Sequence, residues 1–290
     1  MTLTITPISS SVLGAEVRGV DLSGPITVSD RRRIYEAWIE HAVLVVRDQK
    51  LEPGQFSAAA RMFGDILAQQ LKKFALPDHP EVGTISSRDL PVVDGKLHVR
   101  GEEFHTDHSN FSAPPKATIL HAVNLPSRGG DTQFCDARAA YDDLDEATKA
   151  QISSLRSLHV YESTHSTRKM FKLSDKERDA MPRTSQPLVI RHAESGRPAL
   201  YLNTGRMEGI EGMPDEEGYA LIARLFRHAT QPKFEYRHVW QPGDLVIWDN
   251  RSVLHQANAD YDPTELRYLY RIMLQGKPLE AYSAQAVAHA

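Results

Sequence analysis

The sequence has a single cysteine, Cys135, no long apolar run and little excess of either charge. One thiol cannot form an intramolecular disulfide, and by itself it cannot build a cysteine-based zinc or iron–sulfur site. The chain starts without a basic segment followed by an apolar core, and no apolar run reaches membrane-spanning length. We therefore expect a protein of the reducing cytoplasm that is neither exported nor inserted into a membrane.

Charge and length narrow the class further. The formal net charge is −4, with 34 basic and 38 acidic residues, so no electrostatic footprint for nucleic acid or an anionic membrane is present. The 290 residues are 41% hydrophobic, which is enough for a large core. Neither an internal repeat nor a Pro/Gly-rich linker divides the sequence, and we expect one domain over residues 1–290.

Short β-branched or alternating runs recur between turn signals, which is the pattern of many short strands. The runs span residues 3–8, 14–20, 42–47, 117–123, 131–134, 188–192, 199–203, 234–240, 244–248 and 267–275. Strands and helices do not alternate regularly, and this disfavours a doubly wound parallel sheet. The pattern predicts a mainly β (α+β) fold: a double-stranded β-helix, or jelly roll, over approximately residues 100–276 with helices packed outside.

Helical periodicity appears in four segments: 31–41, 55–63, 137–155 and 214–228. Ser29 or Asp30 can cap the first helix, and Asp136 can cap the third. Pro53 can open the second helix and Gly64 can close it.

Three His-x-acid motifs occur, where chance supplies about 1.7. They are His79-Pro80-Glu81, His105-Thr106-Asp107 and His192-Ala193-Glu194. The first and third lie in turn-like stretches that tolerate such residues without a function. The second follows Phe104 in a strand-like segment, where residues i and i+2 share a face. It is a candidate ligand pair, with a surface or capping histidine as the alternative.

A second region contains complementary side chains. A buried strand at 245–248 leads through a polar connection to His255, and the next strand puts Arg267 and Arg271 on one face. Two imidazoles and one carboxylate form the ligand set of a non-haem iron(II) site with three open positions. If the arginines point inward they imply anionic ligands, because a buried charge needs a partner; if outward, they are ordinary surface charges.

Together these segments resemble the family of taurine and 2,4-dichlorophenoxyacetate dioxygenases, which depend on iron(II) and 2-oxoglutarate. The resemblance runs from about residue 13 to 278 and begins with Gly14–Asp21. Its segments are His105-Thr106-Asp107, Pro114-Pro115, Leu125–Thr132, Trp240–Asp244, Trp248–Arg251, His255 and the pair Arg267 and Arg271. An ordered set of this kind is more specific than any one motif.

The resemblance implies a role for each matching residue. His105, Asp107 and His255 match the iron ligands. Arg267 matches the arginine that pairs with the distal carboxylate of 2-oxoglutarate, and Thr132 matches the hydroxyl that supports it. Arg271 matches the arginine that holds the anionic group of the substrate.

The implied reaction uses O2 to decarboxylate 2-oxoglutarate to succinate and CO2 while a small anionic substrate is hydroxylated. A sulfonate, sulfate ester, aryloxy acid or amino-acid derivative fits, and oxidation of a carbon bearing a heteroatom would cleave the substrate. Members of the family are commonly dimers or tetramers.

Departures from the family pattern fall in the expected substrate pocket. His108 follows Asp107 directly, and Arg206 and His165 replace aromatic residues. More cationic groups suggest a more polar or more highly charged acid than taurine. A structural role is the alternative for His108, since a strand neighbour of Asp107 would point away from it. Residues 68–73 form a loop that can cover the site, or simply carry solvated charges.

Two other functions fit part of this pattern. A sensor could bind iron or 2-oxoglutarate without catalysis, and retention of the open triad with Arg267 disfavours it. A zinc hydrolase could use the same triad. The turn Gly129–Thr132 and the two arginines have no role in that mechanism.

Overall fold

The structure is a computed structural model that describes residues 2–8, 11–69, 72–93, 96–166, 174, 176–177 and 180–283. The tail 284–290, whose role the sequence leaves open, lies outside these residues. So do residues 70 and 71 of the expected covering loop.

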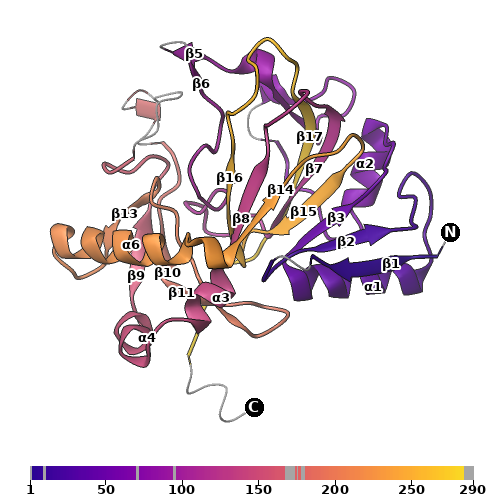
Figure 1. The fold of residues 1–290 in the computed structure, drawn as a ribbon. Coiled ribbons are helices and arrows are strands. Elements are labelled where there is room, and N and C mark those ends of the chain that lie inside the picture. Colours follow the sequence, from indigo (N-terminus) through magenta and orange to yellow (C-terminus); the bar gives the residue numbers. More distant parts are fainter. Residues whose placement is uncertain are drawn as a thin grey trace.

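A seven-stranded sheet forms the larger part of the fold, in the order β1-β2-β3-β15-β7-β17-β4 (Figure 1). Its strands are β1 (Thr4–Pro7), β2 (Ala15–Arg18), β3 (Val43–Val46), β4 (Gly83–Ser86), β7 (Ala117–Asn124), β15 (Leu245–Asp249) and β17 (Tyr268–Leu274). Only β2 and β3 pair in parallel among these described strands. A smaller antiparallel sheet has the order β14-β8-β16, from β14 (Glu235–His238), β8 (Thr132–Asp136) and β16 (Val253–Ala257).

The two sheets pack face to face, because one hydrophobic cluster takes side chains from both. It includes Phe134 and Val253 from the smaller sheet and Leu120, Val246 and Trp248 from the larger. The other face of the larger sheet is covered by α1 (Val28–His41) and α2 (Pro53–Ala60). The predicted β-rich fold with helices outside is confirmed.

The helix ends differ in part from the sequence-based expectation. α1 is capped by Thr27, whose hydroxyl accepts from the Asp30 backbone N–H at 3.0 Å, so Ser29 and Asp30 are not the cap. Pro53 does open α2, which ends at Ala60 rather than at residue 63.

The expected long helix 137–155 is two short ones. Asp136 caps α3 (Ala137–Asp142), as expected, and Asp145 starts α4 (Glu146–Ile152) by accepting from the Thr148 backbone N–H. A second N-cap inside the segment restarts the helix and breaks the predicted one.

A second core lies beside the sheets, where α6 (Asp215–Ala229) and α3 pack on short strands. One group of strands is β10 (Thr184–Pro187), β9 (Arg156–His159) and β13 (Met207–Ile210), and another is β12 (Pro198–Leu200), β11 (Val189–Arg191) and β18 (Glu280–Ala281). A hairpin of β5 (Val92–Val93) and β6 (Lys96–Leu97) and three 3-10 turns, η1 (Lys72–Phe74), η2 (Ser87–Asp89) and η3 (Pro232–Phe234), complete the described elements. None of the described helices combines the length and apolar character needed to cross a membrane.

Candidate active site

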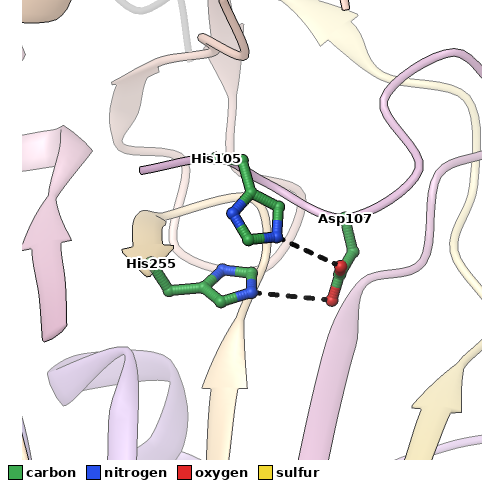
Figure 2. A group of neighbouring side chains, drawn as sticks. All are labelled: His105, Asp107 and His255. Carbon is green, nitrogen blue, oxygen red and sulfur yellow. Dashed lines mark ion pairs between the residues drawn. The ribbon is translucent and has the colours of Figure 1, made fainter. Parts of the chain in front are cut away.

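His105, Asp107 and His255 converge beside β16, the edge strand of the smaller sheet, which carries His255 (Figure 2). Nε2 of His105 lies 3.8 Å from Oδ1 of Asp107, and Nε2 of His255 lies 3.9 Å from Oδ2. One ligand atom from each residue lies within 4.8 Å of the other two. The sequence-predicted triad is therefore brought together.

A pair of backbone hydrogen bonds holds the two histidines side by side. His105 N donates to His255 O at 3.0 Å, and His255 N donates to His105 O at 2.9 Å. The strand expected around His105 reduces to this isolated bridge. The side chains of His105-Thr106-Asp107 still alternate in direction. Thr106 is buried on the opposite side, and its hydroxyl donates to the Asn250 carbonyl at 2.7 Å.

The Asp107 carboxylate is oriented by two residues that the sequence had not singled out for the site. The Thr118 hydroxyl donates to Asp107 Oδ2 at 2.6 Å, and the Asn250 amide donates to Thr118 Oγ1 at 3.0 Å. Asn250 belongs to Trp248–Arg251, one of the segments that carry the family resemblance. That membership was the only indication of its role in the sequence. Such supporting hydrogen bonds fix the direction of a metal ligand.

The protonation states suit metal binding. His105 Nδ1 lies 2.8 Å from the Glu103 carbonyl, which places an N–H on Nδ1, and Nε2 is the nitrogen that faces Asp107. Burial, with the neighbouring His105, lowers the pKa of His255 to about 3. Burial alone would raise the pKa of Asp107, but His255, His105 and Arg271 outweigh it and hold this pKa below its usual value. Neutral imidazoles and an ionised carboxylate are the forms that bind metals.

The triad borders a cavity of about 310 Å³. Five other sequence-predicted residues line it: Thr132, Arg267, Arg271, His108 and Arg206. An apolar wall is made by Leu90, Val99, Phe104, Phe111, Met181 and Met273. The cavity therefore combines a metal-ligand set, cationic groups and apolar surface.

Arg267 is 6% exposed, and its Nε donates to the Gly130 carbonyl at 3.0 Å. Burial lowers its pKa. Four positions further along the same chain segment, Arg271 reaches the same cavity, and its Nε is buried without a hydrogen-bond partner. Within the described residues neither arginine forms an ion pair with a carboxylate. Both arginines therefore line the cavity, which is the alternative that implies anionic ligands.

His108 lies in a turn with φ of 46°, in the left-handed region, and its ring centroid is 5.0 Å from that of Phe111. The strand has ended before it, so alternation does not direct it away from the cavity. Burial, with Arg206 next, lowers its pKa to about 3, which leaves an uncharged imidazole on the wall.

Arg206 and His165 have different surroundings. Nη1 of Arg206 donates to Asn110 Oδ1 at 2.6 Å, and its guanidinium lies 5.0 Å from the centre of the Tyr161 ring. His165 is not among the residues that line the cavity; it stacks on Tyr219 of α6, with ring centroids 3.8 Å apart. The structure thus places Arg206 at the cavity and His165 away from it.

Comparison with known proteins decides the family. Residues 4–273 match the family described as "Taurine catabolism dioxygenase TauD, TfdA family". The chain belongs to the TauD/TfdA family. It is thus a 2-oxoglutarate-dependent non-haem iron dioxygenase that uses O2, which rules out the zinc-hydrolase alternative.

Relatives in the TauD/TfdA family act on several compounds. The alpha-ketoglutarate-dependent 2,4-dichlorophenoxyacetate dioxygenase of Burkholderia sp. (strain RASC) is 37% identical over 272 residues, which cover 90% of this chain and 91% of the relative. The alpha-ketoglutarate-dependent sulfate ester dioxygenase of Pseudomonas putida is 31% identical, over 95% and 90% of the two chains. The crystal structure of AAD-2 in complex with Mn(II) and N-oxalylglycine superposes with a TM-score of 0.81 at 31% identity, over 96% of this chain and 98% of that one.

The donor set in the structure fits the iron of the TauD/TfdA family. Two imidazole nitrogens and one carboxylate meet beside a cavity, and His105, Asp107 and His255 would together hold the metal. When bound, iron supplies the activation of O2 that couples decarboxylation of 2-oxoglutarate to substrate oxidation.

Proposed function

We propose that this dioxygenase hydroxylates a small organic acid. In this proposal His105, Asp107 and His255 hold iron, Arg267 and Thr132 bind the distal carboxylate of 2-oxoglutarate, and Arg271 binds the anionic group of the substrate. The observation that carries the proposal is the pair of cavity-lining arginines without an ion pair in the described chain. Because an unpaired buried cation is costly, two such groups favour two anionic ligands in one cavity.

The position of Arg267 suits the cosubstrate. Its Nε is occupied by the Gly130 carbonyl, which fixes the plane of the guanidinium and leaves the two terminal nitrogens for a carboxylate. Thr132, the first residue of β8, lines the cavity as well. A carboxylate held there is oriented by the protein at one end, which leaves the other end of the 2-oxo acid for the metal.

The remaining cavity wall suits an amphiphilic acid. Arg271 supplies a charge, His108 and Arg206 supply polar contacts, and Phe111 and Met181 belong to the apolar wall. We propose a substrate from the classes of sulfonates, sulfate esters, aryloxy acids or amino-acid derivatives, cleaved where the oxidised carbon bears a heteroatom. The substrates named for the relatives support this range. His165 contributes nothing to this proposal, because it stacks on Tyr219 instead.

We also propose that the two facing sheets form a double-stranded β-helix, with a jelly-roll core over approximately residues 100–276 of a single domain. The shared hydrophobic cluster between the sheets supports this assignment. A dimer or tetramer, as is common in the family, stays a prediction.

The test is an anaerobic titration of the metal-free protein with iron(II) and 2-oxoglutarate, followed by the weak visible charge-transfer band of a chelated 2-oxo acid. We expect the band in the parent and in Arg271→Ala, and a weaker one in Arg267→Ala. Candidate acids should shift the band of the parent and leave that of Arg271→Ala unchanged.

Exposure to O2 should then release succinate, which separates an enzyme from a binding-only sensor. Absence of the band in the iron-loaded parent would contradict the proposed site. A shift of equal size in Arg271→Ala would contradict the role given to Arg271.

A further inference from the structure

We propose that Trp240 is a positioning residue for 2-oxoglutarate. Its indole N–H holds the Thr132 hydroxyl so that the hydroxyl proton is directed to the distal carboxylate in the cavity. This inference rests on the proposed function, in which Thr132 and Arg267 bind that carboxylate.

Trp240 stands behind the cosubstrate residues and does not line the cavity. It follows β14, which pairs with β8 so that His238 lies opposite Thr132. The indole is 8% exposed and packs in the hydrophobic cluster between the two sheets. Its Nε1 lies 3.1 Å from Thr132 Oγ1. Trp240 can therefore act on the cosubstrate only through its neighbours.

The direction of this hydrogen bond is unambiguous, because an indole N–H can only donate. Thr132 Oγ1 is the acceptor, which occupies one of its two lone pairs and leaves one proton to donate. In the described part of the chain no acceptor is found for that proton, although Thr132 is only 3% exposed. A buried donor without an acceptor is costly. The cavity is the remaining direction, and a carboxylate oxygen is the acceptor that completes the arrangement.

The same indole also faces the second cosubstrate residue. The Arg267 guanidinium carbon lies 5.9 Å from the centre of the Trp240 ring. A cation near an aromatic face is stabilised at about this distance, here for a guanidinium that has no ion pair in the described residues. One side chain thus contacts both groups proposed to bind the distal carboxylate.

The turn after Trp240 fixes its backbone. Gln241 N donates to Asp244 Oδ2 at 2.8 Å, and Asp244 N donates to the Gln241 carbonyl at 3.1 Å. Arg47 Nη1 binds the same Asp244 Oδ2 at 2.7 Å. A rigid support of this kind is what a residue needs in order to hold another side chain in one orientation.

The test uses Trp240→Phe, which keeps an aromatic ring and removes the N–H. The iron(II) protein is titrated anaerobically with 2-oxoglutarate and, separately, with pyruvate, a 2-oxo acid without a distal carboxylate. We expect the Kd for 2-oxoglutarate to rise roughly fivefold, the worth of one hydrogen bond, while the Kd for pyruvate stays unchanged. In a Thr132→Val background, Trp240→Phe should have no further effect on the 2-oxoglutarate Kd. Equal weakening of both acids, or of neither, would overturn the proposal.

A second measurement needs no change at Trp240. The parent with zinc(II) in place of iron has three tryptophans, hence three indole N–H signals in a ¹⁵N-correlated NMR spectrum. One of them should shift in Thr132→Val and is thereby assigned to Trp240. Addition of 2-oxoglutarate should move this signal, and pyruvate should not; a signal that stays in place with 2-oxoglutarate would overturn the proposal.

Two variants at the cosubstrate residues separate the binding site from the role of Trp240. If Arg267→Ala and Thr132→Val leave the 2-oxoglutarate Kd unchanged, the proposed binding site for the cosubstrate is wrong. If both weaken binding and Trp240→Phe does not, only the role of Trp240 is wrong.

Discussion

Nε2 of His192 lies 2.9 Å from Oδ2 of Asp249, and each side chain is 1% exposed. His192 begins the turn between β11 and β12, whereas Asp249 ends β15, the strand that precedes β16 with His255. Arg251 completes the group by binding both oxygens of the Asp249 carboxylate. The buried anion is thus fully paired, and it holds the chain immediately before Asn250, which supports Asp107 of the proposed metal site through Thr118.

We predict that His192→Ala lowers the free energy of unfolding by roughly 1–3 kcal/mol, because it leaves a buried carboxylate with fewer donors. His79→Ala is the matched control, since His79 belongs to the same kind of motif but its side chain is 38% exposed and 3.5 Å from Glu81. His79→Ala should lower the free energy of unfolding by less than about 0.5 kcal/mol. Urea denaturation of both variants measures the difference, and equal costs would contradict the role of the buried pair.

The His-x-acid motifs illustrate how far the sequence could be interpreted. Local context correctly separated His105 from the two motifs in turns. It could not indicate that His192 is buried, because its partner Asp249 lies far away in the sequence and only the folded sheet brings them together. Pairings of this kind depend on tertiary structure and leave no local pattern.

A second prediction concerns Gly130 and Gly212, which have φ of 73° and 75°. Alanine at either position should cost roughly 1 kcal/mol of stability through backbone strain. A Cβ at Gly130 would lie 2.8 Å from Nε of Arg267, whereas one at Gly212 would meet nothing within 4 Å. We therefore expect Gly130→Ala, and not Gly212→Ala, to raise the Kd for 2-oxoglutarate. Anaerobic titration checks this, and an unchanged Kd in Gly130→Ala would contradict the position given to Arg267.

A third prediction separates the metal ligands from the substrate residue. Asp107→Ala and His255→Ala should abolish succinate formation, since each removes one of three ligands. Arg271→Ala should keep slow, uncoupled turnover of 2-oxoglutarate while the KM for the substrate rises roughly 10- to 100-fold, as expected for loss of a charged hydrogen bond. Succinate release with and without substrate distinguishes these cases. Loss of uncoupled turnover in all three variants would show that Arg271 has another role.

A fourth prediction concerns pH and His159, which is fully buried with Nδ1 2.9 Å from the Ser109 hydroxyl. Burial, followed by the charge of Arg206, lowers its pKa to about 3. The unfolded chain, with a pKa of about 6.5, therefore binds a proton that the folded protein does not. Stability should fall as the pH is lowered from 6.5 towards 3, by up to roughly 1.4 kcal/mol per pH unit from this group.

His159→Gln removes that titration. Unfolding measured from pH 8 to pH 5 should give a constant difference between parent and variant above pH 7. Below pH 6.5 the parent should lose stability relative to the variant, by up to roughly 1.4 kcal/mol per pH unit. A difference that does not change with pH would show that folding does not lower the pKa of His159.

Strand periodicity was informative where strands are apolar, and failed elsewhere. It placed Arg267 and Arg271 on one face and left open whether that face points inward. Both line the cavity, although Arg267 precedes β17 and the pairing of β17 with β7 is irregular between Tyr268 and Leu269. Periodicity missed β16, which carries His255, and also β9, because polar residues interrupt their apolar pattern. For these strands, pairing with neighbours outweighs local propensity.

The immediate surroundings of the proposed metal ligands were harder to predict. His108 has a left-handed backbone that the strand argument could not anticipate. His165 finds its stacking partner on a helix distant in sequence. Trp240 lies in the strand-like run 234–240 and in the family pattern, but neither indicates its contact with Thr132, which depends on the pairing of β14 with β8.

The mutual backbone hydrogen bonds of His105 and His255 also bear on the biosynthesis of the enzyme. A ribosome makes the chain from its N-terminus, so His105 and Asp107 emerge long before the segment that places His255 beside them. Until then the nascent chain offers only two of the three proposed ligands. The backbone hydrogen bonds that hold His105 beside His255 cannot yet form. With iron held by the proposed triad, we expect iron loading to follow synthesis of β16, and any product truncated before residue 255 to remain without its metal.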